Sequence, residues 1–144
     1  MARSGAVVMG RNLFDVVDAP DGWSDDIGYG AHHVGRPPFF VVTHRRPVDV
    51  RLGLDFTFVS AGMAAAVDAA RSACPAEQDV VIMGGGNVIA QAVDLGLVDE
   101  LLLHVSPVVM GDGTPLCAGI SRRQLRQASV LVSPFATHIT FATT

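Results

Sequence analysis

The run VVIMGGGNVIAQA, residues 80–92, constrains the possible folds of this chain more than any other segment. Four apolar residues at 80–83 predict a buried strand, and residues 87–95 predict a helix that stops at Gly96. Three consecutive glycines join the strand to the helix. A glycine turn at the carboxyl end of a parallel strand lets a ligand approach the backbone, and free N–H groups of the next helix attract anions. The segment therefore predicts a phosphate site, with a plain strand–helix turn that tolerates glycine as the alternative.

Two common phosphate motifs do not match this turn. A P-loop ends in Gly-Lys-Ser or Gly-Lys-Thr, whereas here the chain continues from Gly86 to Asn87 and Val88. A Rossmann fingerprint places its third glycine at the position of Ile89. The sequence therefore excludes both motifs.

The rest of the chain alternates between strand-like and helix-like patterns. Ser60 is a predicted N-cap for an alanine-rich helix, and Pro107 interrupts the last long strand before the terminal hairpin. Because strands that alternate with helices form parallel sheets, we expect an α/β fold whose sheet is parallel in its middle and antiparallel at one edge. The predicted strands are residues 6–9, 39–43, 56–59, 80–83 and 100–109, the predicted helices 12–17, 61–73 and 87–95, the long loop 18–37, and the hairpin strands 124–132 and 135–143.

Composition favours one globular domain over residues 1–144. Hydrophobic residues make up 49% of the chain and charged residues 17%. The net charge of −4 argues against nucleic-acid or anionic-membrane partners, and no apolar run approaches the ~20 residues of a membrane span. Cys74 and Cys117 lie far apart without metal-ligand spacing, so we expect reduced thiols, no metal site and a cytoplasmic protein.

Two further strand ends carry groups that suit an anion. One predicted strand ends in Gly10 and continues with Arg11, and another ends in Thr43, followed by His44 and Arg45. Each signal is weak alone, because most surface arginines are solvated charges. Together with the glycine turn they fit a dinucleotide with a pyrophosphate and a separate 2′-phosphate. An acidic residue would favour the unphosphorylated ribose, so the basic cluster predicts NADPH over NADH.

Four segments carry a resemblance to a known family: VVMGRNLF, residues 7–14; FFVVTHRRP, residues 39–47; residues 80–116; and ATHITF, residues 136–141. They resemble the dihydrofolate reductase-like superfamily. Within it, they are most similar to the branch of the C-terminal reductase domain of the bifunctional riboflavin-biosynthesis deaminase/reductase and its stand-alone bacterial relatives. The central block is the most specific, with a glycine triplet, a short helix, a strand that begins Asp-Glu-Leu, and then Pro-Val-x-x-Gly-x-Gly.

The resemblance implies a three-layer α/β/α fold and an NADPH-dependent reductase that transfers a hydride to a small planar heterocycle of the pteridine or pyrimidine type. It also implies a homodimer that pairs through sheet-edge or terminal strands. Relatives often have a cis Gly-Gly bond in the glycine turn. Two departures are Leu13, where many relatives have threonine, and Cys117, where many have phenylalanine. Carried over to this chain, the cofactor-binding residues are Gly10, Arg11, Asn12, Thr43, His44, Arg45, Met83, Gly84, Gly85, Gly86, Asn87, Val88 and Ile89.

The resemblance also implies a strand and a helix that this chain lacks. Relatives begin with a strand that lies in the sheet between those matching residues 80–83 and 101–106, and the segment after it supplies much of the substrate pocket. Either the chain is truncated at its N-terminus, which we favour, or the flanking strands pair directly, or another chain fills the gap. The catalytic proton donor would lie in the lacking segment, so no catalytic residue is predicted.

Other polar residues offer weaker hypotheses. In the loop at residues 22–36, Asp25, Asp26, His32 and His33 could line a substrate pocket and Trp23 or Tyr29 could stack on a planar ring; the alternative is a solvated loop with an aromatic anchor. Met83 and residues 105–113 could approach the nicotinamide, and His104 and His138 are predicted to be structural.

Two competing functions remain at this stage. A non-catalytic NADP-binding module would bind NADPH without oxidising it. A purely structural protein would show no thermal shift with NADPH.

Overall fold

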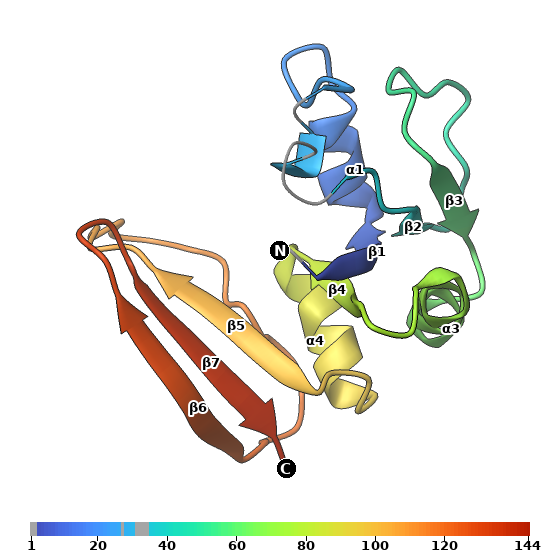
Figure 1. Cartoon of the computed structure of the whole chain (residues 1–144). Coiled ribbons are helices and arrows are strands. Elements are labelled where there is room, and N and C mark those ends of the chain that lie inside the picture. The colour runs from blue at the N-terminus through green and yellow to red at the C-terminus, as the bar shows by residue number, and fades with distance from the viewer. Residues whose placement is uncertain (1–2, 27, 31–34) are drawn as a thin grey trace.

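A computed structural model describes residues 3–26, 28–30 and 35–144 of the chain (Figure 1). Within these ranges, no helix is long and apolar enough to cross a membrane. In chain order the elements are β1 (Ser4–Gly10), α1 (Arg11–Val17), the 3-10 turn η1 (Gly28–Gly30), β2 (Phe39–Val42), β3 (Phe56–Val59), α3 (Met63–Ala73), β4 (Asp79–Met83), α4 (Gly86–Asp94), β5 (Glu100–Val105), β6 (Leu125–Val132) and β7 (Thr137–Thr143).

The first four strands form a parallel sheet in the order β3-β2-β1-β4. β1 lies between two neighbours, with Val8 opposite Phe40 of β2 and Ile82 of β4. All seven residues of β1 are buried, which explains its continuous apolar sequence, because a parallel strand is covered on both faces. Each fully buried valine or methionine contributes about 1.5–3 kcal/mol of transfer free energy.

Helices cover both faces of the parallel sheet. On one face, Ala6 and Val8 pack against α3 and α4. On the other, Val7 and Met9 pack against α1 and the aromatic side chains that follow it. Side chains of a strand alternate between faces, so the apolar run of β1 supplies both cores. The three-layer α/β/α arrangement expected from the sequence is confirmed here.

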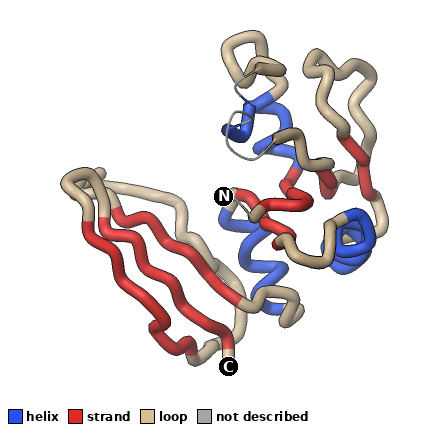
Figure 2. The backbone as a smooth tube through the Cα atoms, in the orientation of Figure 1, coloured by secondary structure: helices blue, strands red, loops and turns tan. Residues whose placement is uncertain are grey.

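The last three strands form an antiparallel sheet in the order β5-β7-β6 (Figure 2). The terminal hairpin is confirmed as β6 and β7, with a register shift between Gln127 and Ser129. The prediction of a strand over residues 100–109 is wrong at its end, because β5 stops at Val105, two residues before Pro107. Proline cannot donate to a ladder, and the strand ends before it.

The predicted N-cap of the alanine-rich helix is also wrong. α3 begins after Gly62, which has a φ of 92° and caps the helix without a side-chain hydrogen bond. Ser60 lies two residues earlier. A glycine provides the positive φ that this entry into the helix requires.

Among the described residues, β4 pairs with β1 alone and β5 pairs with β7 alone. The strands that the resemblance places on either side of a lacking strand therefore do not close up. Direct pairing of these flanking strands, one of the three explanations offered by the sequence, is wrong for this structure. Truncation and a strand from another chain stay predictions.

Candidate functional site

The three strand ends singled out in the sequence lie at one edge of the parallel sheet. Gly10 at the end of β1 is opposite Val42 at the end of β2, and Met9 is opposite Met83 at the end of β4. The order β2-β1-β4 makes these ends direct neighbours. In open α/β sheets, ligands bind outside the carboxyl ends of the strands. The fold therefore brings together the glycine turn, the Gly-Arg-Asn segment and the Thr-His-Arg segment.

The turn after β4 requires glycine at two positions. Gly84 and Gly85 have φ angles of 49° and 79°, in the left-handed region that L side chains rarely adopt. A Cβ on Gly85 would meet nothing within 4 Å, so the backbone here faces open space. All peptide bonds in the described residues are trans, so the cis Gly-Gly bond is not found. The turn is an exposed stretch of bare backbone that a phosphate can approach.

The other two glycines serve packing. A Cβ on Gly86 would lie 2.9 Å from the carbonyl oxygen of Pro115 and 3.0 Å from that of Leu116. A Cβ on Gly10 would lie 2.5 Å from Cγ2 of Val88. Val88 therefore fills the space in the Cβ direction of Gly10, and the close approach of a ligand to Gly10 stays a prediction.

The N-terminus of α4 supplies the donors. Its N-cap residue Gly85 makes no side-chain cap, and the N–H of Ile89 donates to Gly85 at 3.1 Å. The N–H groups of Gly86, Asn87 and Val88 therefore precede the first hydrogen bond of the helix. Because the side chain of Val88 is buried, this residue can offer a ligand only its backbone.

Thr43 fixes the turn after β2. Its hydroxyl donates to the carbonyl of Arg45 at 2.8 Å and accepts from the N–H of Arg45 at 3.3 Å. Thr43 is 8% exposed, so its hydroxyl is buried and makes its hydrogen bonds within the protein. The hydroxyl shapes the backbone that carries His44 and Arg45, both of which are exposed.

Arg11, the first residue of α1, contacts the turn after β2. Its Nη1 donates to the carbonyl of Arg45 at 2.8 Å, and its Nε lies 2.6 Å from Oδ1 of Asp15. Arg46 lies over the ring of Phe58 at 5.6 Å. For the side chains of Arg45 and His44, which are both exposed, the structure gives no such contact.

The remaining predicted cofactor residues take different positions. Asn12 is exposed on α1, and Met83 is half-buried against the aromatic cluster. Leu13, which replaces the threonine of many relatives, would lie 3.2 Å from a Cβ on Gly84. Ile89 lines a groove beside β4.

The loop aromatics belong to the core. Tyr29 is 6% exposed, and its hydroxyl lies 3.2 Å from that of Ser4. Burial raises the pKa of Tyr29, and the hydrogen bond with Ser4 lowers it in part. Trp23 lies 6.2 Å from the ring of Tyr29 and 6.0 Å from that of Phe39. The hypothesis that Tyr29 stacks on a substrate is corrected, because its ring is packed inside the protein.

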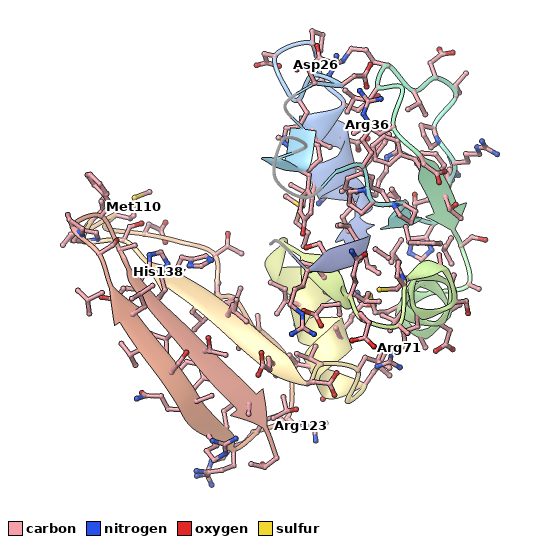
Figure 3. The ribbon with its side chains drawn as sticks, viewed as in Figure 1. Asp26, Arg36, Arg71, Met110, Arg123 and His138 are labelled. Atoms are coloured by element: carbon pink, nitrogen blue, oxygen red, sulfur yellow. The ribbon has the colours of Figure 1, made fainter. Side chains whose placement is uncertain are left out.

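The loop carboxylates also have partners within the chain. Asp25 accepts from the N–H of Gly53 at 2.7 Å, and Asp26 lies 4.0 Å from Arg36. His32 and His33 lie outside the described residues. Across the residues that are described, no group of three or more His, Cys, Asp or Glu side chains could hold a metal ion. Figure 3 labels Asp26 and Arg36 at the end of the molecule away from the three-stranded sheet.

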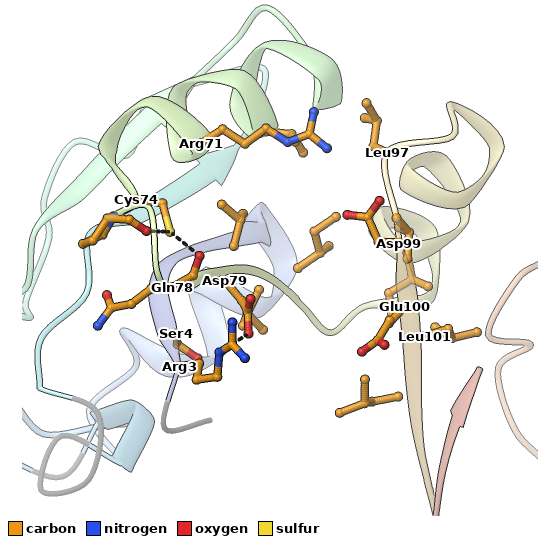
Figure 4. Close-up of a pocket in the computed structure, with 18 of the residues that line it drawn as sticks. Arg3, Ser4, Arg71, Cys74, Gln78, Asp79, Leu97, Asp99, Glu100 and Leu101 are labelled. Atoms are coloured by element: carbon orange, nitrogen blue, oxygen red, sulfur yellow. Dashed lines mark hydrogen bonds and ion pairs between the residues drawn. The ribbon is translucent and has the colours of Figure 1, made fainter. Parts of the chain in front are cut away.

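A groove of about 820 Å³ separates β4 from β5 (Figure 4). Val80 and Ile82 of β4 and Leu101 of β5 line it, together with Ile89 of α4. At one end Arg3 and Asp79 form an ion pair of 3.5 Å. The sequence pointed to a gap between these strands through the resemblance alone. It gave no sign that the carbonyls of residues 115–116 would close over Gly86.

The parallel sheet has helices on both faces, and an antiparallel sheet follows it in the chain. This is the fold of the dihydrofolate reductase-like superfamily. The chain belongs to the RibD C-terminal domain family, whose model matches residues 1–139.

Solved structures share the fold. A putative riboflavin biosynthesis protein from Shewanella sp. PV-4 is 21% identical with a TM-score of 0.72, covering 99% of this chain and 75% of its own. A pyrimidine reductase-like protein from Corynebacterium diphtheriae is 16% identical with a TM-score of 0.65, covering 99% and 78%. Dihydrofolate reductase from Enterococcus faecalis, complexed with NADP(H), is 16% identical with a TM-score of 0.58, covering 96% and 73%.

Among curated proteins, the uncharacterized protein YyaP of Bacillus subtilis is 41% identical over 46 residues. The match covers 32% of this chain and 24% of YyaP, so the chain aligns with about a quarter of that relative's length.

Proposed function

We propose that this chain is an NADPH-dependent reductase that transfers a hydride to a small planar heterocycle of the pteridine or pyrimidine type. The glycine turn carries the proposal. It has two left-handed glycines, open space in front of Gly85 and the uncapped start of α4 behind it. The NADP(H) bound to the E. faecalis neighbour and the pyrimidine reductase-like neighbour support this choice of cofactor and substrate class.

The glycine turn fits a pyrophosphate on physical grounds. Bare backbone at residues 84–85 allows close approach, and three N–H groups at the start of α4 can donate to phosphate oxygens. The positive end of the helix dipole adds a favourable field. Gly84, Gly85, Asn87 and the backbone of Val88 would hold this part of the cofactor.

The turn after β2 fits the 2′-phosphate. Arg45 is exposed there, beside His44, while Thr43 and Arg11 hold its backbone carbonyl. A guanidinium can bind phosphate through two parallel hydrogen bonds. In this assignment Arg45 contacts the phosphate and Arg11 acts as a positioning residue.

The bound cofactor supplies the hydride, and the chain supplies binding and orientation. Met83 leads from β4 into the glycine turn, so a dinucleotide on this turn would extend along the end of β4. The groove beside β4 has apolar walls from Val80, Ile82 and Leu101, which suit a planar ring. No described residue is assigned as proton donor.

Arg45→Asp tests the cofactor assignment. Reversing this charge should weaken NADPH binding at least tenfold and leave NADH binding nearly unchanged, because only NADPH carries the 2′-phosphate. Isothermal titration calorimetry with both cofactors measures this. Arg122→Asp, an equal charge change on an exposed arginine in the segment that leads into β6, is the control and should alter neither affinity. An unchanged preference in Arg45→Asp would place the 2′-phosphate elsewhere.

The catalytic part is tested by NADPH oxidation in the presence of pteridine and aminopyrimidine substrates, followed by absorbance of the reduced nicotinamide. The alternative function is an NADP-binding module without catalysis. It is favoured by the groove between β4 and β5, because these strands do not pair and the described residues leave the substrate side open. If the chain binds NADPH but oxidises it with none of these substrates, the result would support the binding module. Under either function, we propose that the protein is cytoplasmic.

A further inference from the structure

Two histidines face each other across the three-stranded sheet. His104 of β5 and His138 of β7 are directly opposite in the antiparallel register. Their Nδ1 atoms are 2.6 Å apart and their ring centroids 4.8 Å apart. Figure 3 labels His138 near the end of the sheet that also carries Met110. At this distance the two Nδ1 atoms cannot both be protonated, so at least one of them has a free lone pair.

The turn between β6 and β7 places a polar partner at the other ring nitrogen of His138. Ser133 Oγ donates to the carbonyl of Ala136 at 3.0 Å and accepts from the N–H groups of Phe135 and Ala136 at 3.3 and 3.1 Å. It also lies 3.5 Å from Nε2 of His138. A polar partner at the far ring nitrogen orients histidines that bind metals.

The positions nearest the two histidines on this face of the sheet are uncharged. By strand alternation and register, the face includes Leu102 of β5 and Thr140 of β7 next to them. Glu100 of β5 and Arg126 of β6 are both opposite Ala142, two residue pairs along β7 from His138. Their charges are opposite and lie in one row, so no positive residue stands next to the two rings.

We propose that His104 and His138 form a two-histidine site for a divalent transition metal such as Zn²⁺ or Ni²⁺, ligated through both Nδ1 atoms. Imidazole nitrogens suit these ions, and their bonds to Zn²⁺ are about 2.0–2.1 Å long. Tetrahedral ligation places two such nitrogens about 3.3 Å apart. The present 2.6 Å separation has to widen by less than 1 Å, which a small rotation of the exposed His104 ring provides.

Binding replaces the hydrogen bond between the rings by two bonds to the metal. The Nδ1 proton between the rings moves through solvent to Nε2 of the ring that carried it, so both rings stay neutral and both Nδ1 lone pairs point at the ion. Solvent can reach the site because His104 is exposed, so water completes the coordination. The site does not depend on the cofactor proposal, because both ligands lie on the antiparallel sheet.

Calorimetric titration of the full chain with ZnCl₂ and NiCl₂ tests the site, with the thiols of Cys74 and Cys117 blocked beforehand. We expect one ion per chain. His104→Gln and His138→Gln should each weaken binding at least tenfold, since each leaves one ligand. Glutamine retains a polar side chain on the strand, and circular dichroism checks that the sheet is intact.

Two control variants separate this site from other histidines. His44→Gln changes an exposed histidine in the turn after β2 and should leave the affinity unchanged. The double variant His32→Gln/His33→Gln should also leave it unchanged. Loss of binding in the double variant with retention in His104→Gln would overturn the proposal, as would absence of any binding by the intact chain. Broadening of the His104 and His138 resonances by Ni²⁺ provides a second readout should one strand variant fail to fold.

Discussion

Gly85 shows how one residue sets the chemistry of an edge. Its φ of 79° excludes most side chains, yet nothing in the protein lies within 4 Å of its missing Cβ. Gly86, by contrast, is required by the carbonyls of Pro115 and Leu116. The same residue type therefore serves two purposes in adjacent positions, and only the open position is available to a ligand.

Gly85→Ala should weaken NADPH binding at least tenfold, because the added methyl occupies the approach to the backbone. Gly96→Ala is a matched control, since Gly96 also has a positive φ, 68°, with nothing within 4 Å of its Cβ position. Both changes carry a similar backbone cost of about 1–2 kcal/mol. Calorimetric titration compares the two, and equal affinities would remove Gly85 from the cofactor site.

Tyr29 provides a residue-scale test of the aromatic core. Its pKa is raised by burial, so the neutral phenol stabilises the fold below the unfolded value of about 10, and that stability is lost as pH rises through the folded pKa. Tyr29→Phe should cost about 1 kcal/mol at neutral pH by leaving Ser4 without its partner. It should also reduce the loss of stability above pH ~10. Urea unfolding at both pH values measures each effect; an unchanged alkaline slope would contradict the assignment.

At the scale of elements, the start of α4 is set by its contact with the end of β1. Val88 packs over Gly10, and this contact holds the helix N-terminus above the sheet edge. The sequence predicts both residues in a binding site, and the structure adds that the side chain of Val88 packs against Gly10, which leaves the backbone of Val88 for a ligand. The contact between Val88 and Gly10 therefore positions both the start of α4 and the carboxyl edge of the parallel sheet.

Gly10→Ala should lower the free energy of unfolding by about 2 kcal/mol, because its Cβ would lie 2.5 Å from Val88 Cγ2. Val88→Ala removes that methyl and should relieve the clash, so the double variant should be more stable than the sum of the single effects predicts. Chemical denaturation of the three variants gives the coupling. Strict additivity would show that the two residues do not share the space.

At the scale of the whole molecule, the groove between β4 and β5 lies between the two sheets. The antiparallel sheet ends in exposed apolar side chains that have little cover within the chain: Val108, Val109, Met110, Val132 and Phe135 are 63%, 99%, 80%, 73% and 82% exposed. Apolar groups gathered in this way mark an interaction surface. The homodimer that the family resemblance predicts stays a prediction, and we propose this end of the terminal strands as its contact surface.

We expect the chain to sediment as a dimer, and Phe135→Ser to shift it toward monomer by removing the most exposed aromatic side chain of this surface. Val48→Ser is the control, since Val48 is 97% exposed but lies in the loop between β2 and β3. Analytical ultracentrifugation over a range of concentrations measures both. A monomer at all concentrations, or an unaffected dimer in Phe135→Ser, would contradict the prediction.

Most elements and the shared edge could be predicted from the sequence, because both depend on local pattern. The apolar runs of β1, β2 and β4 and the glycines after them required only periodicity and turn chemistry. The features that the sequence did not indicate depend on contacts between distant segments. Tyr29 is buried by Phe39, and Thr43 and Arg11 are engaged by the turn at Arg45. No local pattern encodes such pairings.

The sequence by itself therefore determined the order of strands and helices and the three strand ends that meet at the carboxyl edge of the parallel sheet. The tertiary structure alone decided which glycine there is open and which is filled, that β4 and β5 stay unpaired, and that His104 lies against His138. The physical reason is that secondary structure follows from neighbours along the chain, whereas free space and side-chain proximity follow from how distant elements pack.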